Sequence, residues 1–282
     1  SVSDIAGYRA RTAVGYTKDG RYALIIAVDS DDTSDGMSIS ELQQFMIDVG
    51  VWKGMILDGG GSTQMVARPL GEFGAKLVNS PEYGSQRQVV NGLGVFSTAP
   101  QGELSGFIVD GRKQVLVGEQ VSFAIKAYDQ YYNPVDPKSI AVNWSANSRA
   151  GSFDNNVFQA AKAGTATVTV SAVNASGKTV KQDYPIEVIG GSQVKNMYFA
   201  APNYLLSEGV SYKLPVYVTT KANETIQVPP NLVSWQLKGV EGTVSGDTFT
   251  VTKVTGKTAQ LKATYDGVSQ VLTLPVGEYK TW

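Results

Sequence analysis

Residues 57–63 read Leu57-Asp58-Gly59-Gly60-Gly61-Ser62-Thr63, a carboxylate followed by three glycines and two hydroxyl side chains. The apolar residues 51–57 predict a buried strand that ends at this motif. Three glycines permit a sharp turn whose successive N–H groups form a concave anion site, and the hydroxyl groups can donate to the same oxygens. A phosphate or sugar phosphate is the expected ligand, and a glycine turn that binds nothing is the alternative.

The preceding residues predict a strand and a helix. Residues 22–28 form an apolar, partly β-branched run of strand length. Ser38 and Glu41 have the spacing of a capping box, and apolar side chains follow at helical intervals as far as Val49. Gly50 then suits a left-handed residue after the helix. We predict a helix over residues 39–49.

This strand, helix and strand indicate a crossover unit, which is right-handed if the two strands are parallel neighbours. Asp58 and the glycines would then lie at the carboxyl end of a strand. Ligands bind at that edge in open α/β sheets.

Other short motifs flank this unit. They are Arg11-Thr12-Ala13-Val14-Gly15, Asp29, Gly36-Met37-Ser38-Ile39-Ser40-Glu41-Leu42, Val78-Asn79-Ser80-Pro81 and Arg87. Together with residues 57–63 they resemble the carboxyl-terminal half of a phosphodiester glycosidase domain, over roughly residues 7–97. This is the family of the uncovering enzyme that removes N-acetylglucosamine from sugar-phosphate diesters.

The resemblance implies hydrolysis of a glycosyl phosphodiester. We expect no cofactor. The resemblance also implies a site formed by Asp58, the loop Gly59–Thr63, Arg11, Asn79 and Arg87. We assign catalysis to Asp58, Arg11 and Arg87, and substrate binding to Gly59, Gly60, Gly61, Ser62, Thr63, Asn79 and Asp29. We infer that the glycine loop and an arginine hold the phosphate, because neutralised charge makes a sugar phosphate a good leaving group. Asp58 is then either the base or a group that orients the sugar hydroxyls.

The family's domain has an additional amino-terminal half, which this chain does not contain. A half-domain of this size leaves sheet edges and an apolar face uncovered. We therefore expect a complementary amino-terminal segment, or self-association of the chain, to cover them.

Composition excludes several other kinds of function. The chain of 282 residues is 42% hydrophobic and carries 24 basic and 25 acidic residues, so its net charge of -1 provides no basic face for nucleic acid. Zero cysteines exclude disulfides and thiolate chemistry, and zero histidines remove the usual general base. No apolar run approaches the ~20 residues of a membrane span.

Residues 97–102 have the composition of a linker, and the remaining sequence predicts strands. Val142-Asn143-Trp144 through Gly151 is repeated, 91 residues later, as Val233-Ser234-Trp235 through Gly242. That offset is the length of one β-sandwich. Both copies resemble bacterial immunoglobulin-like domains.

We therefore predict three domains, at residues 1–101, 102–190 and 191–282, with a short hinge at Gly190-Gly191-Ser192. The fold class is a partial α+β domain, with a mixed sheet and a helix, followed by two all-β immunoglobulin-like sandwiches. Trp144 and Trp235 are interpreted as core residues of these sandwiches, and sugar stacking is the alternative.

Asp29, Asp31, Asp32 and Asp35 lie close together before the predicted helix. A solvated loop is the favoured interpretation, because the spacing does not fit an EF-hand, and a calcium site is the alternative. Asp29, at the end of the first predicted strand, can instead face the glycine loop.

The sequence therefore favours a bacterial enzyme, secreted or at the cell surface, that hydrolyses a glycosyl phosphodiester such as a GlcNAc-1-phosphodiester or a cell-wall glycan phosphate. The sandwiches would be stalk or docking modules. The alternative is a non-catalytic surface module that binds glycan or has a structural role and contains a degenerate glycosidase half-domain.

Overall fold

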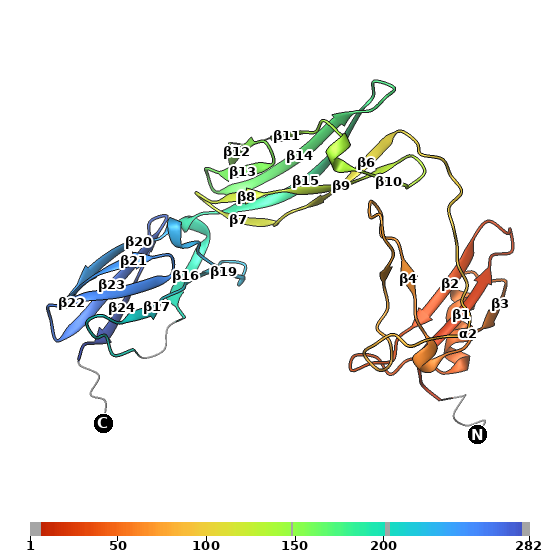
Figure 1. The fold of residues 1–282 in the computed structure, drawn as a ribbon, viewed down its shortest axis with the longest axis horizontal. Coiled ribbons are helices and arrows are strands. Elements are labelled where there is room, and N and C mark those ends of the chain that lie inside the picture. The colour runs from red at the N-terminus through yellow and green to blue at the C-terminus, as the bar shows by residue number, and fades with distance from the viewer. Residues whose placement is uncertain (1–6, 148, 201–203, 278–282) are drawn as a thin grey trace. The chain divides into compact units, whose positions relative to one another are not determined.

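A computed structural model of the chain describes residues 7–147, 149–200 and 204–277 (Figure 1). It contains two compact units. The first extends to Gly102 and also includes Tyr131–Pro134, and the second holds Glu103–Gln130 and the chain from Val135 onward. The domain boundary that we predicted between residues 190 and 191 lies inside the second unit, so both sandwiches are described together.

Strand β1 (Arg11–Tyr16) is the centre of the sheet in the first unit, with β2 (Ala23–Val28) on one side and β3 (Lys53–Ile56) on the other. Both pairs are antiparallel, and Ala13 lies opposite Ile26 and Ile56. β2 and β3 therefore run parallel but are not neighbours. The predicted mixed sheet with adjacent parallel strands is wrong, because that prediction treats residues 11–15 as a site motif and omits the strand that they form.

Helix α2 (Ile39–Asp48) confirms the predicted helix and ends one residue earlier. The Ser38 hydroxyl accepts a hydrogen bond from the Glu41 N–H, and the Glu41 carboxylate accepts one from the Ser38 N–H at 2.9 Å. Gly50 has a φ of +87°, as a left-handed residue after the helix requires. Leu42 and Met46 pack on Ala13 of β1 and form the small core of this unit.

The remaining elements of the first unit are short. They are the 3-10 turn η1 (Gly60–Ser62) and the antiparallel pair β4 (Val66–Ala67) and β5 (Lys76–Leu77).

Much of the apolar surface of the first unit is exposed. The predicted buried strand is in fact β3, an edge strand on which Met55 is 60% exposed, because no further strand covers it in the described part of the chain. Twenty-one of the 25 large hydrophobic side chains found exposed among the described residues precede residue 97. Residues 88–96 include Val90, which is fully exposed, and none of their backbone N–H groups donates to another backbone group of the described chain.

The second unit consists of two β-sandwiches in series. The strands of the first are β6 (Leu104–Asp110), β7 (Gln114–Leu116), β8 (Gln120–Ser122), β9 (Ala124–Asp129), β10 (Pro134–Val135), β11 (Asn143–Ala146), β12 (Gly151–Asp154), β13 (Val157–Ala160), β14 (Gly164–Val173) and β15 (Thr179–Ile189). Those of the second are β16 (Val194–Phe199), β17 (Ser211–Lys213), β18 (Val216–Thr220), β19 (Thr225–Gln227), β20 (Ser234–Lys238), β21 (Val240–Ser245), β22 (Thr248–Val254), β23 (Thr258–Tyr265) and β24 (Val268–Pro275). Short 3-10 turns are η2 (Pro137–Ser139), η3 (Gly191–Gln193) and η4 (Pro230–Leu232).

The sequence repeat is a repeat of topology. The pairings β11-β14-β15, β12-β13-β8 and β10-β9-β6 of the first sandwich recur as β20-β23-β24, β21-β22-β17 and β19-β18-β16 in the second. The parallel pair of β7 with β15 also has a counterpart in the parallel bridge between Leu206 and Val276. The two copies are thus equivalent domains.

The repeated tryptophan belongs to the core in both copies, as predicted. Trp144 stacks on Phe153 with ring centroids 5.5 Å apart, and both contact the fully buried Phe123. Trp235 packs into the equivalent core of the second sandwich. The repeated Gly151 and Gly242 lie against Phe158 and Phe249, where a Cβ atom would come within 2.4 and 2.5 Å of the ring.

The predicted hinge between the sandwiches is wrong, because residues 190–193 form a packed 3-10 turn. The Gly191 N–H donates to the Asp266 carboxylate at 2.6 Å, and a Cβ on Gly191 would lie 2.1 Å from the Asp266 carbonyl oxygen. Leu116 and Ile189 of the first sandwich share one apolar cluster with Tyr265 of the second. These contacts couple the two sandwiches.

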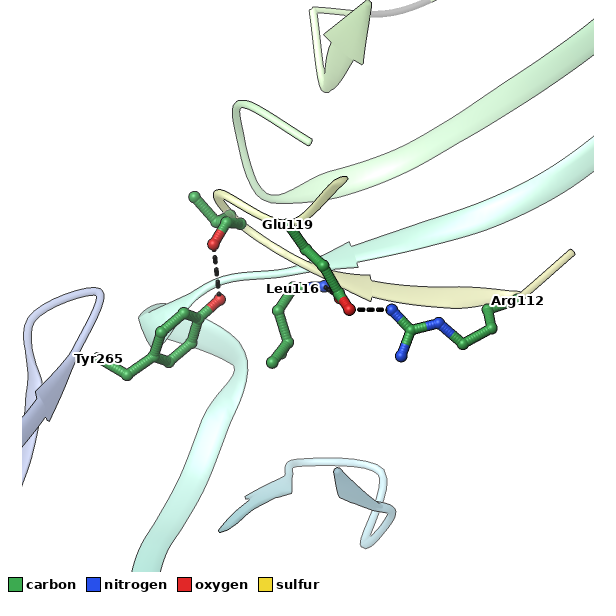
Figure 2. A network of polar contacts seen from close by, with 5 residues as sticks. Arg112, Leu116, Glu119 and Tyr265 are labelled. Carbon is green, nitrogen blue, oxygen red and sulfur yellow. Dashed lines mark hydrogen bonds and ion pairs between the residues drawn. The ribbon is translucent and has the colours of Figure 1, made fainter. Parts of the chain in front are cut away.

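Tyr265 is the centre of this junction. Its hydroxyl donates to the Ile189 carbonyl at 2.8 Å and also lies 3.4 Å from the Val117 carbonyl. Figure 2 shows Tyr265 beside Arg112, Leu116 and Glu119. The loop that carries Val117 is closed by Glu119, which accepts hydrogen bonds from the Leu116 N–H and the Arg112 guanidinium. Burial, followed by the charge of Asp266, raises the pKa of the Tyr265 phenol.

We predict that this raised pKa makes the stability of the second unit depend on pH. Below about pH 10 the phenol is neutral in both states, so the contribution is intact; above that, the unfolded phenol ionises first and the free energy of unfolding falls by up to ~1.4 kcal/mol per pH unit. Tyr265→Phe should lower the free energy of unfolding by ~1 kcal/mol at pH 7. It should also remove the part of the alkaline decrease that comes from ionisation of this phenol. Urea unfolding between pH 7 and 11 measures both, with Tyr198→Phe as the control. An equal slope in the wild type and Tyr265→Phe would contradict the prediction.

Candidate functional site

The glycine loop after β3 is a tight 3-10 turn. Gly60 and Gly61 are buried, and Gly60 has a φ of +59°, which glycine adopts without strain. Each glycine also packs closely on a neighbour. An added Cβ would lie 2.8 Å from the Ala10 carbonyl at Gly59, 3.0 Å from the Glu82 carboxylate at Gly60 and 2.8 Å from the Tyr83 ring at Gly61. Close packing on three sides therefore explains why three glycines follow one another.

Most N–H groups of the loop donate within the protein. Gly60 donates to the Ala10 carbonyl at 2.8 Å, Ser62 to the Gly59 carbonyl at 3.2 Å and Thr63 to the Gly60 carbonyl at 2.9 Å. These three N–H groups are therefore used in closing the turn. An anion at this loop would have to be held mainly by side chains.

Two of the predicted substrate-binding residues, Asp29 and Asn79, form a direct contact. The Asn79 amide donates to the Asp29 carboxylate at 2.9 Å and to the Thr63 carbonyl at 3.1 Å, and its oxygen accepts from the Met65 N–H at 2.7 Å. The Ser80 N–H donates to the second Asp29 oxygen at 2.9 Å. This network joins the end of β2, the residues after the glycine loop and residues 79–80.

Arg87 lies beside the loop. Its guanidinium donates to the Ser62 hydroxyl, and its carbonyl accepts from the Gln64 side chain at 2.8 Å. A Cβ on Gly61 would be 3.6 Å from the same guanidinium. Arg87 is exposed, so this cation can meet an anion that approaches Ser62 from solvent.

Arg11 lies in a different environment. It is 4% exposed, and its guanidinium donates to the Met37 carbonyl at 2.8 Å and to the Gly7 carbonyl. Burial, and then the neighbouring Arg9 charge, lowers the pKa of Arg11. The structure thus gives Arg11 the contacts of a residue that ties β1 to the chain before α2.

Asp58 immediately precedes the loop and is exposed. Among the described residues, its carboxylate has no hydrogen-bond or ion-pair partner. Thr63, in contrast, is fully buried, and its hydroxyl accepts from Thr12 at 3.1 Å. Asp58, Ser62 and Arg87 are therefore the predicted site residues with side chains that can reach a ligand.

Sequence reasoning missed three side chains that surround the loop, Arg9, Glu82 and Tyr83. A Cβ on Gly60 would lie 3.0 Å from the Glu82 Oε2 and 3.6 Å from the Arg9 Nη2. The Tyr83 ring lies against Gly61. Glu82 and Tyr83 directly follow the Val78-Asn79-Ser80-Pro81 motif, and this adjacency was the available signal.

The acidic cluster before α2 is a hydrogen-bonded loop. Asp29 binds Asn79 and Ser80, and Asp31 accepts from the Thr33 N–H and hydroxyl, each at 2.8 Å. These bonds from Thr33 lower the pKa of Asp31. In residues 7–147, 149–200 and 204–277, no three acidic side chains lie close enough together to hold a metal ion.

Residues 2–96 match the family model described as phosphodiester glycosidase. This match identifies a phosphodiester glycosidase-like region within the chain. A comparison with curated protein sequences finds no match.

Solved structures that resemble the chain have low similarity. The adhesin InvE of Yersinia pseudotuberculosis is 16% identical over 63% of this chain and 61% of its own length, with a TM-score of 0.28. A surface layer protein structure, SbsC domains 1–6, is 10% identical over 97% of this chain and 50% of its own, with a TM-score of 0.30. In the part of the chain that is described, no helix is long and apolar enough to cross a membrane.

We predict that Asn79 stabilises the loop. Asn79→Ala removes three hydrogen bonds and leaves the Met65 N–H and one Asp29 oxygen without that partner. It should therefore lower the free energy of unfolding of the loop by about 2–4 kcal/mol. Hydrogen exchange of the loop amides measures the loss, with the exposed Asn91→Ala as the control. Equal protection in both variants would show that the network contributes nothing.

Proposed function

We propose that the first unit contributes a site that hydrolyses a glycosyl phosphodiester, such as a GlcNAc-1-phosphodiester or a glycan phosphate of the cell wall. The observation that carries the proposal is the grouping of Asp58, Ser62 and Arg87 at one tight loop, within a region that matches the phosphodiester glycosidase family. Arg87 supplies a cation and Ser62 a hydroxyl for the phosphate. Asp58 supplies an exposed carboxylate for the sugar.

The chemistry follows from these groups. Hydrolysis breaks the bond between the anomeric carbon and the phosphate oxygen, and the phosphate leaves with the electron pair. A guanidinium next to that oxygen stabilises the charge as it develops. Arg11 is buried and donates to backbone carbonyls, so it acts by fixing the start of β1. The preceding residue, Ala10, accepts the hydrogen bond of the Gly60 N–H.

We propose a secreted or cell-surface bacterial location, with the two sandwiches as a stalk or docking module. A non-catalytic glycan-binding or structural module is the second candidate. The N–H groups of the loop favour it in one respect, because three of them are used internally and cannot bind phosphate.

Asp58→Asn distinguishes these two functions. The change is nearly isosteric and removes a charge that has no partner in the described structure, so folding should be retained and turnover of an N-acetylglucosaminyl phosphodiester should fall ~100-fold or more. Melting temperature is measured in parallel, and Asp32→Asn, on an exposed loop, is the control. Wild-type turnover in the Asp58 variant would remove this carboxylate from the mechanism. Ligand binding without turnover in the wild type would favour the non-catalytic module.

We also propose that a complementary β-rich segment, with apolar side chains at alternate positions, covers the exposed surface of the first unit. Both outer edges of the sheet lack a neighbouring strand in the described chain. Residues 88–96, which include five large apolar side chains, form no backbone–backbone hydrogen bond there. An added strand would satisfy these groups and bury Met55 and Val90. Self-association of the chain is the other way to cover them.

Without that segment, residues 1–282 should not remain a 30.1 kDa monomer. Sedimentation velocity combined with denaturing mass analysis should show either a second polypeptide or self-association. Met55→Lys, at a side chain that is 60% exposed, should weaken self-association, whereas Val173→Lys, at one that is 65% exposed on the second unit, should not. A stable, fully active monomer would contradict the proposal.

A further inference from the structure

Glu82 has a fixed position over the glycine loop. The Asp29 carboxylate holds the backbone at Ser80 and the side chain at Asn79, each at 2.9 Å. On the other side, the Gly84 N–H donates to the Pro81 carbonyl at 2.8 Å, and Gly84 has a φ of +71°. Glu82 is thus the second residue of a closed turn and has little freedom to move.

Its carboxylate is in an unusual state for an acidic side chain. Oε2 is buried, and no donor among the described residues makes a hydrogen bond to it. It points at Gly60, since it lies 3.0 Å from the position of a Cβ on that glycine. A buried polar atom without a partner lowers stability, and such atoms in a folded protein are associated with function.

The two carboxylates at the loop have different surroundings. Asp58 precedes the loop and is exposed to solvent. Glu82 covers the loop from a second segment and has one oxygen shielded from solvent. When two carboxylates beside one site have different environments, one of them can transfer the proton while the other orients the sugar.

We propose that Glu82 is the general base of the site, a role that rests on the proposed hydrolysis of a glycosyl phosphodiester. Water attacks the anomeric carbon with an oxygen lone pair, and the carbon–oxygen bond to phosphate breaks with its electron pair on phosphate. The proton of the attacking water passes to the carboxylate of Glu82, a residue that is partly exposed although its Oε2 is buried, and is later released to solvent. Asp58 then orients the sugar hydroxyls, and Arg87 stabilises the departing phosphate.

The test compares Glu82→Gln with the wild type and with Glu72→Gln. Glu72 is paired with Lys76 at 2.9 Å, in the first unit and outside the loop, so its variant controls for loss of a carboxylate. Using an N-acetylglucosaminyl phosphodiester, Glu82→Gln should lower kcat by ~100-fold or more and change KM little. Its melting temperature should be unchanged or higher, because Oε2 forms no hydrogen bond that the change would break.

A second variant provides a readout that a structural role would not give. In Glu82→Ala, sodium formate should restore part of kcat, since the small carboxylate can occupy the space of the missing group. Formate should have no effect on Asp58→Asn.

The outcomes separate this inference from the function on which it rests. Active wild type together with active Glu82→Gln, or no rescue by formate, overturns the role of Glu82 and leaves the hydrolysis intact. A lowered melting temperature with a proportional loss of activity makes Glu82 a structural residue and also overturns it. No turnover by the wild type overturns the hydrolysis and the base together.

Discussion

The Asp29 carboxylate is the interaction on which the candidate site depends. It receives hydrogen bonds from Asn79 and Ser80, and Asn79 in turn binds Thr63 and Met65. Three segments that are distant in sequence are joined by these bonds. The apolar core beneath them is small, and among the described residues the buried members of its cluster are Ala13, Leu42 and Met46. Polar contacts therefore have a larger part in ordering this unit than in a domain with a full core.

The second unit is stabilised in a different way. Each sandwich has its own core with a tryptophan, and a third apolar cluster joins them through Leu116, Ile189 and Tyr265. Because Gly191 packs on Asp266, the connection between the sandwiches is part of this cluster and is not a flexible linker. Tyr265 therefore contacts residues of both sandwiches.

Elements specified by local contacts could be predicted from the sequence, and those specified by distant contacts could not. The helix before Gly50 was predictable because Ser38 and Glu41 satisfy one another within one turn. The repeated Trp144 and Trp235 revealed two equivalent sandwiches for the same reason, since the strand pattern around each is local. The exposure of β3 and the packing of Gly191 depend on segments far away in sequence. Glu82 was missed because its relation to Gly60 exists only once the chain is folded.

The contacts of the glycine loop change how its three glycines are interpreted. A run of three glycines suggests N–H groups directed at a phosphate, but here Gly60, Ser62 and Thr63 donate to neighbouring carbonyls. The glycines instead allow Ala10 and Tyr83 to approach the backbone more closely than a Cβ would permit, and Glu82 to approach it tightly. In the function proposed above, recognition of an anion would depend on the Ser62 hydroxyl and the Arg87 guanidinium, which contact one another. Because the turn is closed by backbone bonds, substitution of these side chains would leave the turn that positions them intact.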